Sequence, residues 1–243
     1  MQTPPKNQQI LEPKLAPNGN RNKLLTTEPL INRGMTLAEC KTICTSPLIP
    51  LRERTYFRII YFTLLRPMEV LNLKIEDFNK ETGEVIARKT KGKYNRWTME
   101  TQHQIRHLPV DDITKEFIKT LISNRKKGFI FESNDTPGKP ISKRYMQERI
   151  NKYAKLLSIQ QVRRYAQSDD NPEDTRILPL VTLMALRKAG ERHHDANEGD
   201  SSLSAQAAGH TMKTKIKHYQ GEQDWEAVGT SLRKHHPGFV EGF

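Results

Sequence analysis

The sequence predicts an α+β fold, a mostly helical domain that carries one small antiparallel β-hairpin. Apolar residues recur with helical spacing over most of the chain from about residue 36 onward. Two short strand patterns follow the turn sequence Asn-Lys-Glu-Thr-Gly at residues 79–83, and the chain contains no internal repeat. Several helices with a few antiparallel strands are typical of the α+β class.

Capping residues and apolar faces place the predicted helices. Thr36 and Glu39 form a capping box, so we expect the folded part to begin there. Residues 51–65 have a wide apolar face, and Pro67 suits the first turn of a short helix. Further helices are expected at about residues 113–124, 143–157 (capped by Ser142), 180–196, 202–207, 212–219 and 225–234.

The predicted hairpin pairs residues 84–89 with residues 105–110, and Val85 and Ala87 lie on one side of its first strand. Loops are expected at two polar stretches, the basic residues 91–104 and the acidic residues 167–174.

The chain carries a large excess of positive charge. Its 243 residues include 40 Lys and Arg against 28 Asp and Glu, which gives a net charge of +12. Such an excess favours a polyanionic partner, most often DNA or RNA. A membrane surface is the competing partner, but the longest apolar stretches, at 59–65 and 177–186, are too short to span a bilayer. The N-terminus lacks an apolar run, so no secretory signal is expected.

The cysteines and the clustered histidines do not predict a metal site. Cys40 and Cys44 share a helix face without a partner at ligand spacing, so we expect reduced, half-buried thiols in a cytosolic protein. His193, His194 and His218 likewise lack a carboxylate or cysteine at ligand spacing.

The last quarter of the chain places an arginine, a histidine and a tyrosine at fixed intervals. Arg187 lies in Leu-Arg-Lys, His210 follows 23 residues later in Ala-Gly-His-Thr, and Tyr219 comes nine residues after that in Lys-His-Tyr. A tyrosine can attack a phosphodiester only if cationic donors hold the phosphate beside it. Taken singly, Arg187 also fits a surface ion pair, and Tyr219 also fits a half-buried packing role.

Together with two upstream segments, this spacing resembles the tyrosine recombinases, also called the phage integrase family. In the segment 65–73, Arg66 precedes Glu69 by three positions, and the segment 91–96 is basic and begins with a lysine. The segments stand in the family's order, and the resemblance covers about residues 36–222. It implies a mostly helical catalytic domain that needs neither a cofactor nor a metal ion.

The resemblance assigns the chemistry of DNA strand exchange to named side chains. It makes Tyr219 the nucleophile that attacks phosphorus, which gives a covalent 3′-phosphotyrosine and a free 5′-hydroxyl. Arg66 and Arg187 are expected to hold the non-bridging oxygens, where charge grows in the transition state. Because an unpaired charge is costly within the apolar face around Arg187, we expect this arginine to point into a cleft. His210 is expected to donate a hydrogen bond to the phosphate or to transfer a proton.

Five further residues are expected to support this chemistry. Lys91 is the expected general acid for the leaving 5′-oxygen, with Lys89 as its alternative. Glu69 is expected either to orient the preceding arginine or to form an exposed ion pair with it. Met184 stands where the family usually has a histidine, and a thioether cannot donate a hydrogen bond. A slower enzyme, or compensation by Lys188 as a phosphate contact, is therefore expected.

The predicted organisation has three parts. Residues 1–33, rich in Pro, Asn, Gln and Lys, form a flexible basic arm, and residues 34–222 form the catalytic domain. Residues 223–243 form a C-terminal helix or tail that docks on a neighbouring protomer or folds back on its own core. Family members clamp the duplex with a helical core-binding domain ahead of the catalytic domain. Here only the arm stands in that place, so we expect it to wrap DNA, or an accessory protein to supply the other jaw. A naturally minimal enzyme and a catalytic fragment of a longer protein are the alternatives.

The expected partners are double-stranded DNA and further copies of this chain, as a tetramer on DNA, with a cytoplasmic, nucleoid-associated location. Two other functions are compatible with the sequence. A recombinase fold that only binds DNA, as a regulator, accounts for Met184 and the missing clamp. A basic RNA-binding or ribosome-associated protein accounts for the charge alone, and it predicts that Arg66, Arg187 and Tyr219 lie far apart.

Overall fold

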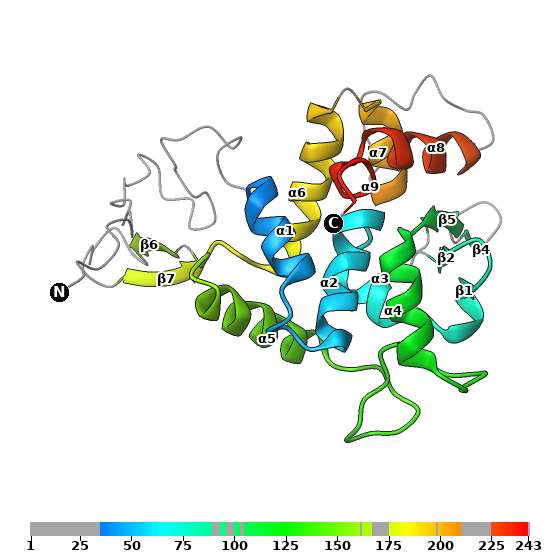
Figure 1. Cartoon of the computed structure of the whole chain (residues 1–243), viewed down its shortest axis with the longest axis horizontal. Helices are drawn as coiled ribbons and strands as arrows, with labels where there is room; N and C mark the ends of the chain where they lie inside the picture. The colour runs from blue at the N-terminus through cyan, green and yellow to red at the C-terminus, as the bar shows by residue number, and fades with distance from the viewer. Residues whose placement is uncertain are drawn as a thin grey trace.

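The computed structural model describes residues 35–88, 93–95, 100–102, 105–160, 162–166, 175–197, 199–209 and 225–242. The chain is mostly helical with a small antiparallel sheet, as predicted (Figure 1). The helices are α1 (Leu37–Thr45), α2 (Leu51–Thr63), α3 (Pro67–Leu71), the 3-10 helix η2 (Ile75–Asp77), α4 (Asp112–Ile122), α5 (Lys143–Leu156), α6 (Leu183–Ala196), α7 (Ser201–Ala208), α8 (Trp225–His235) and α9 (Pro237–Val240). The strands are β1 (Phe78–Asn79), β2 (Glu84–Arg88), β3 (Lys93–Asn95), β4 (Glu100–Gln102), β5 (Ile105–Pro109), β6 (Val162–Ala166) and β7 (Thr175–Pro179).

Local capping chemistry sets the helix starts. Thr36 and Glu39 make the predicted capping box at α1, and the Ser142 hydroxyl accepts a hydrogen bond from the first turn of α5. Pro67 occupies the first turn of α3. The predicted start of α6 at residue 180 was wrong, because the Thr182 hydroxyl accepts the Ala185 N–H at 3.1 Å and caps the helix there.

The predicted hairpin forms two strands of a three-stranded antiparallel sheet with the order β1-β2-β5. Val85 pairs with Leu108, and Val85 and Ala87 are both buried, as the alternation predicted. Residues 91–104 were predicted to be a loop, but they contain the antiparallel pair β3–β4. A second unpredicted hairpin, β6–β7, lies beside the end of α5 in Figure 1. The predicted loop at 167–174 and helix at 212–219 lie outside the described residues.

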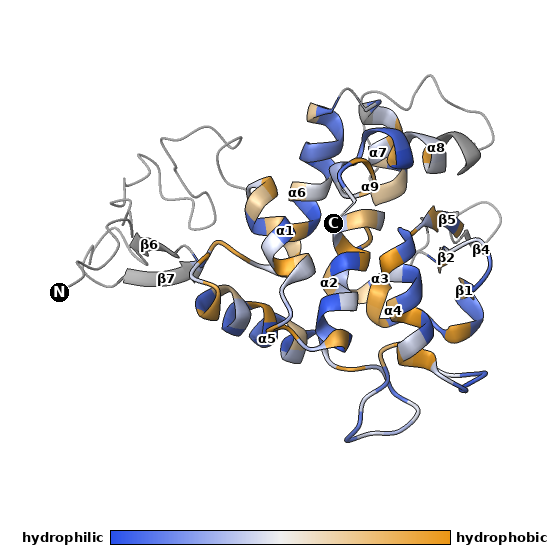
Figure 2. Cartoon of the chain, viewed as in Figure 1, coloured by the Kyte–Doolittle hydropathy of each residue, from blue (hydrophilic) through white to orange (hydrophobic). Residues whose placement is uncertain are grey.

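Helix α2 forms the centre of the core and is contacted by α1, α4 and α6. Figure 2 shows apolar segments on α3 and α4 beside it. Helix α6 crosses α2 closely at Gly190, where an added Cβ would lie 2.4 Å from the carbonyl oxygen of Tyr61. Helix α8 packs against α7 and β5 of its own chain, which buries Val228 and Leu232. Docking of residues 223–243 on a neighbouring protomer therefore stays a prediction.

The two cysteines are fully buried rather than half-buried, because both face the core from α1. Burial raises the pKa of the Cys44 thiol to about 12 and raises that of Cys40 further. Within the described residues, no helix combines the length and the apolar character that crossing a bilayer requires.

A buried ion pair joins α2 to α4. Arg58 is 1% exposed, and its Nη2 lies 2.6 Å from Oδ2 of Asp111, the N-cap of α4. Its Nε donates to the Thr114 hydroxyl at 2.7 Å, and its Nη1 donates to the carbonyl of Cys44 at 3.3 Å. One guanidinium thus holds three helices together.

Asp111→Ala is expected to destabilise the protein by about 3 kcal/mol, because it leaves the buried Arg58 charge without its carboxylate. The control is Asp112→Ala, which removes the neighbouring carboxylate, 99% exposed, and should leave the free energy of unfolding nearly unchanged. Urea denaturation measures both variants. Similar losses in the two variants would contradict a structural role for the buried pair.

Candidate functional site: an arginine cluster at the end of helix α7

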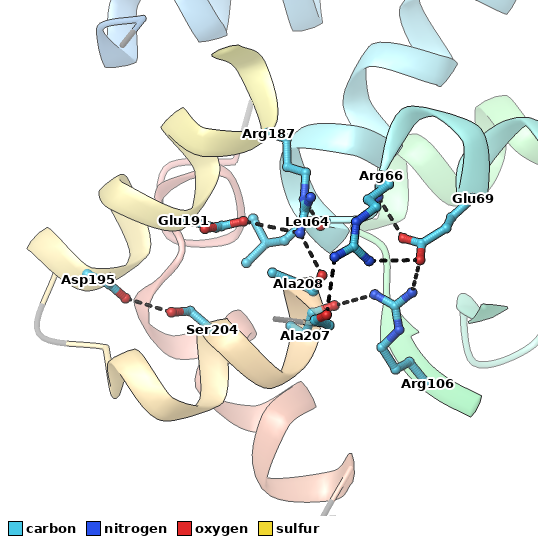
Figure 3. Close-up of polar contacts among 11 residues, drawn as sticks. Leu64, Arg66, Glu69, Arg106, Arg187, Glu191, Asp195, Ser204, Ala207 and Ala208 are labelled. Carbon is cyan, nitrogen blue, oxygen red and sulfur yellow. Dashed lines mark hydrogen bonds and ion pairs between the residues drawn. The ribbon is translucent and has the colours of Figure 1, made fainter. Parts of the chain in front are cut away.

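Three arginines bind three consecutive backbone carbonyls at the C-terminal end of α7 (Figure 3). Arg106 Nη1 donates to Ala207 at 2.8 Å, Arg187 Nη2 donates to Ala208 at 2.6 Å, and Arg66 Nη2 donates to Gly209 at 3.3 Å. The last carbonyls of a helix have no partner within the helix and carry partial negative charge, so they attract cations. We refer to these three side chains as the arginine cluster.

Arg66 is held by the local structure between α2 and α3. Leu64 ends α2 in the left-handed conformation, with a φ of 59°, and Arg66 is the N-cap of α3. Glu69 accepts the Arg66 backbone N–H at 2.8 Å through Oε2 and lies 3.3 Å from Nη1 through Oε1. The side chain of Arg66 is 37% exposed, whereas Glu69 is buried. The alternative prediction, an exposed ion pair, therefore holds only for Arg66, because the carboxylate of Glu69 is buried.

Arg187 lies on the buried face of α6, together with Leu183, Leu186 and Ala189. Its Nε donates to the carbonyl of Leu64 at 2.6 Å, and its Nη2 lies 3.4 Å from Glu191. The residue is 1% exposed, which excludes a surface ion pair, and its guanidinium contacts the ends of α2 and α7. Burial lowers the pKa of this guanidinium, and the carboxylate of Glu191 opposes that shift.

Arg106, the third member, is a site residue that the sequence interpretation missed. It lies on β5 with no exposed surface, and its Nη2 is 2.7 Å from Glu69 Oε1. A signal was present in the strand pattern. Arg106, Leu108 and Val110 stand two positions apart, and a strand places such residues on one face, here the buried one.

The remaining predicted residues divide into two groups. Met184 and Lys188 are exposed on α6, in the turns on either side of Leu186. The other four lie outside the described residues, namely Tyr219, His210, Lys91 and Lys89. His210 directly follows Gly209, the last residue of the cluster's carbonyl series.

Of the clustered histidines, His193 and His194 have protein partners, and His218 lies outside the described residues. Nδ1 of His193 lies 2.9 Å from the Tyr61 hydroxyl, and Nε2 of His194 lies 3.1 Å from the Ser231 hydroxyl. Burial lowers the pKa of His193 to about 4. Among the residues that the structure describes, no group of three or more His, Cys, Asp or Glu side chains is arranged to hold a metal ion.

The electrostatics of the cluster favour an anion. Among the described side chains, three guanidinium groups face the two carboxylates of Glu69 and Glu191, which leaves one excess positive charge. Burial alone would raise the pKa of Glu69, but the charge of Arg106, and then hydrogen bonds from Arg106 and the Arg66 backbone, hold it below its ordinary value of 4.5. The cluster can bind a phosphate oxygen at its partly exposed member, Arg66.

The helical architecture with its small antiparallel sheet is that of a tyrosine recombinase catalytic domain. The sequence pattern of the phage integrase family matches residues 34–176, more than half of the chain, and the chain belongs to that family.

Solved structures of integrases and recombinases share this fold. The integrase from mycobacterium phage Brujita superposes with a TM-score of 0.60 at 12% identity, over 88% of this chain and 61% of that one. XerA recombinase superposes with a TM-score of 0.56 at 17% identity, over 84% of this chain and 65% of that one. The Tn1549 transposon integrase, solved in complex with a circular intermediate DNA, superposes with a TM-score of 0.54 at 16% identity, over 86% of this chain and 68% of that one. The chain thus spans less than two thirds of the first two proteins. No protein of curated function matches the sequence.

Gly209→Ala is expected to destabilise the protein more than an alanine at an open glycine. Gly209 has a φ of +65°, and an added Cβ would lie 3.1 Å from Arg106 Nη1. Gly138 has a φ of +78° with open space around it, so Gly138→Ala carries the backbone strain alone, about 1 kcal/mol. Crowding of the arginine should add about 1–3 kcal/mol in Gly209→Ala. Urea denaturation measures the free energy of unfolding of both variants. Equal losses would mean that a methyl group at position 209 does not crowd Arg106.

The lowered pKa of Glu69 predicts a specific pH dependence. A carboxylate with a lowered pKa stabilises the folded state above its unfolded-state pKa, and this contribution is lost as the pH falls through the folded-state value. The wild type should therefore exceed Glu69→Gln in free energy of unfolding at neutral pH, and this difference should shrink as the pH falls below 4.5. Unfolding curves collected from pH 7 to pH 3 check this, and a constant difference would contradict it.

Proposed function

We propose that the protein is a site-specific DNA recombinase or integrase that cleaves and rejoins DNA through a covalent 3′-phosphotyrosine. The observation that carries this proposal is the position of Arg66 and Arg187. They are far apart in the sequence, yet they bind the adjacent carbonyls of Gly209 and Ala208, directly before His210. This proximity argues against an RNA-binding protein defined by charge alone, for which there is no reason to gather these arginines.

In the proposed reaction, Tyr219 Oη attacks the phosphorus and the bond from phosphorus to the 5′-oxygen breaks. The tyrosine gives its proton to solvent, directly or through His210, and Lys91, or Lys89 in its place, protonates the leaving 5′-oxygen. Arg66 and Arg187 stabilise the negative charge that grows on the non-bridging oxygens, and His210 donates a hydrogen bond to the phosphate where it does not transfer the proton. A 5′-hydroxyl attacks the phosphotyrosine in the reverse step. The number of phosphoester bonds is conserved, so no external energy source is needed.

The geometry separates the roles of the two arginines. Arg66 is the partly exposed member and would contact the phosphate directly. Arg187 is buried and bonded to two carbonyls, so a movement of the end of α7 would be needed before its guanidinium reaches the phosphate. Lys188, exposed one residue later, would supply a further phosphate contact.

The proposed partners are double-stranded DNA and three further copies of this chain, at the nucleoid in the cytoplasm. An accessory protein would supply the second jaw where the arm at residues 1–33 does not.

A second candidate, a recombinase-fold regulator that binds DNA without cleaving it, is favoured by one observation. Met184, which stands where the family usually has a histidine, is 38% exposed and cannot donate a hydrogen bond. Cleavage activity separates the two candidates.

Mapping of covalent protein–DNA junctions tests the proposed function. The wild type and Tyr219→Phe are expressed in cells that carry the element or host DNA, and DNA attached to denatured protein is sequenced. We expect discrete junctions, linked through a 3′-phosphate, in the wild type and none in Tyr219→Phe. DNA bearing a recovered junction, nicked beside the cleavage point to trap the adduct, is called the junction substrate below. Binding to DNA without any junction would support the regulator.

Arg66→Gln is expected to slow adduct formation on the junction substrate by about 10²- to 10³-fold, because one phosphate-binding donor is lost. DNA affinity should change only a few-fold, since binding is spread over many cations. Arg125→Gln is the matched control, because Arg125 also pairs with a glutamate and its side chain is also 37% exposed. Gel quantification of the adduct measures both variants. A loss of affinity as large as the loss of cleavage would make Arg66 an ordinary anchor.

A further inference from the structure

We propose that Arg106 is a positioning residue of this site, which fixes Glu69, and through Glu69 the guanidinium of Arg66, against the end of α7. The inference rests on the proposed function, in which Arg66 contacts the DNA phosphate. Arg106 is fully buried, so it acts through its neighbours and not by touching DNA.

A single carboxylate oxygen joins the two arginines. Oε1 of Glu69 lies 2.7 Å from Nη2 of Arg106 and 3.3 Å from Nη1 of Arg66. Oε2 is occupied by the backbone N–H of Arg66 at 2.8 Å. Figure 3 shows Glu69 between the two guanidinium groups. The carboxylate cannot turn to follow a moving Arg66 without breaking its buried pair with Arg106. Arg106 therefore fixes the position of the carboxylate to which Arg66 binds.

The other end of the same guanidinium holds the last turn of α7. Nη1 of Arg106 donates to the carbonyl of Ala207 at 2.8 Å, and the backbone of Gly209 lies close to the guanidinium, since a Cβ added to this glycine would lie 3.1 Å from Nη1. Arg106 is itself fixed by the pairing of β5 with β2 and by α8, which packs on β5. One side chain thus sets the relative position of the sheet, Glu69 and the turn that leads into His210.

This double contact requires an arginine. The planar guanidinium presents two terminal nitrogens, whereas a lysine has one ammonium group and cannot serve both Glu69 and Ala207 in the same geometry. Stability alone does not require an arginine here, because apolar replacements of buried ion pairs are often neutral or stabilising. In addition, Nε of Arg106 has no hydrogen-bond partner within the described part of the chain. Fixing the geometry of Glu69 and α7 is the role that the contacts support.

The first experiment needs no DNA. We compare the wild type with Arg106→Gln by NMR, following the ¹⁵N relaxation of Arg66 Nε and the ¹³C titration of the Glu69 carboxyl. In Arg106→Gln, Arg66 Nε should become mobile and Glu69 should titrate at higher pH. Arg66, the N-cap of α3, and Arg187 on α6 are the other charged groups that act on Glu69 among the described residues, and this variant retains both side chains. Arg88 lies on β2, the strand that pairs with β5, and forms an ion pair with Asp77 of η2. Arg88→Gln removes this ion pair and should change neither signal. An Arg66 that stays rigid in Arg106→Gln would overturn the proposal.

The second experiment measures cleavage of the junction substrate. Arg106→Gln should slow adduct formation by about 10- to 100-fold at saturating DNA, with little change in the DNA concentration that gives half the maximal rate. The acid limb of the pH–rate profile should also move to higher pH, because Glu69 loses its charge earlier. A residue that only supported folding would lower the amount of active protein without moving that limb. If Arg106→Gln forms the adduct at the wild-type rate and with the wild-type pH–rate profile, a positioning role is refuted.

The two proposals fail in distinguishable ways. If the wild type forms no adduct, the proposed function fails, and the NMR comparison still decides whether Arg106 positions Arg66. If Arg106→Gln does not fold, Arg106→Lys replaces it in both experiments, because it keeps a cation beside Glu69. Arg106→Lys should keep the low titration of Glu69 but slow adduct formation, since the contact with Ala207 is lost. Full activity in Arg106→Lys would show that charge alone suffices and would overturn the geometric role.

Discussion

The contact between the arginine cluster and the C-terminal carbonyls of α7 is the interaction on which the rest of the site depends. At the C-terminal end of a helix, several carbonyls point the same way and have no partner within the helix. In this chain each of those carbonyls takes a guanidinium from a different element, namely Arg66 before α3, Arg106 on β5 and Arg187 on α6. The unpaired carbonyls at the end of α7 thus hold the three elements together.

The packing of the core serves this arrangement. Helix α6 approaches α2 closely because Gly190 has no side chain, and one turn earlier this brings Arg187 to the carbonyl of Leu64. Leu64 exposes that carbonyl because its left-handed backbone ends α2. Glu69 then offsets part of the positive charge that the cluster gathers. Close packing at one glycine and one unusual backbone conformation are thus sufficient to bring two distant arginines to adjacent carbonyls.

Sequence reasoning succeeded where the interactions are local and was incomplete where they are long-range. The contact between Arg66 and Glu69 spans one helical turn, and the hairpin of β2 with β5 follows from alternation and a turn, so both were predictable. The apolar run at 177–186 was assigned to one helix from residue 180. The structure divides it between β7 and α6, because Thr182 starts the helix. The partners of Arg187 and Arg106 depend on where α7 ends in space, and no periodicity in the sequence encodes that.

The position of α8 has a consequence for the tyrosine. Helix α8 lies on β5 and α7 of its own chain, so the segment between Gly209 and Trp225 is attached to the same body at both ends. Tyr219 stands six residues before Trp225, and six extended residues reach about 20 Å. If Tyr219 is the nucleophile, as proposed, its delivery to a second subunit would require that α8 detach or that the second subunit lie within that distance of α8.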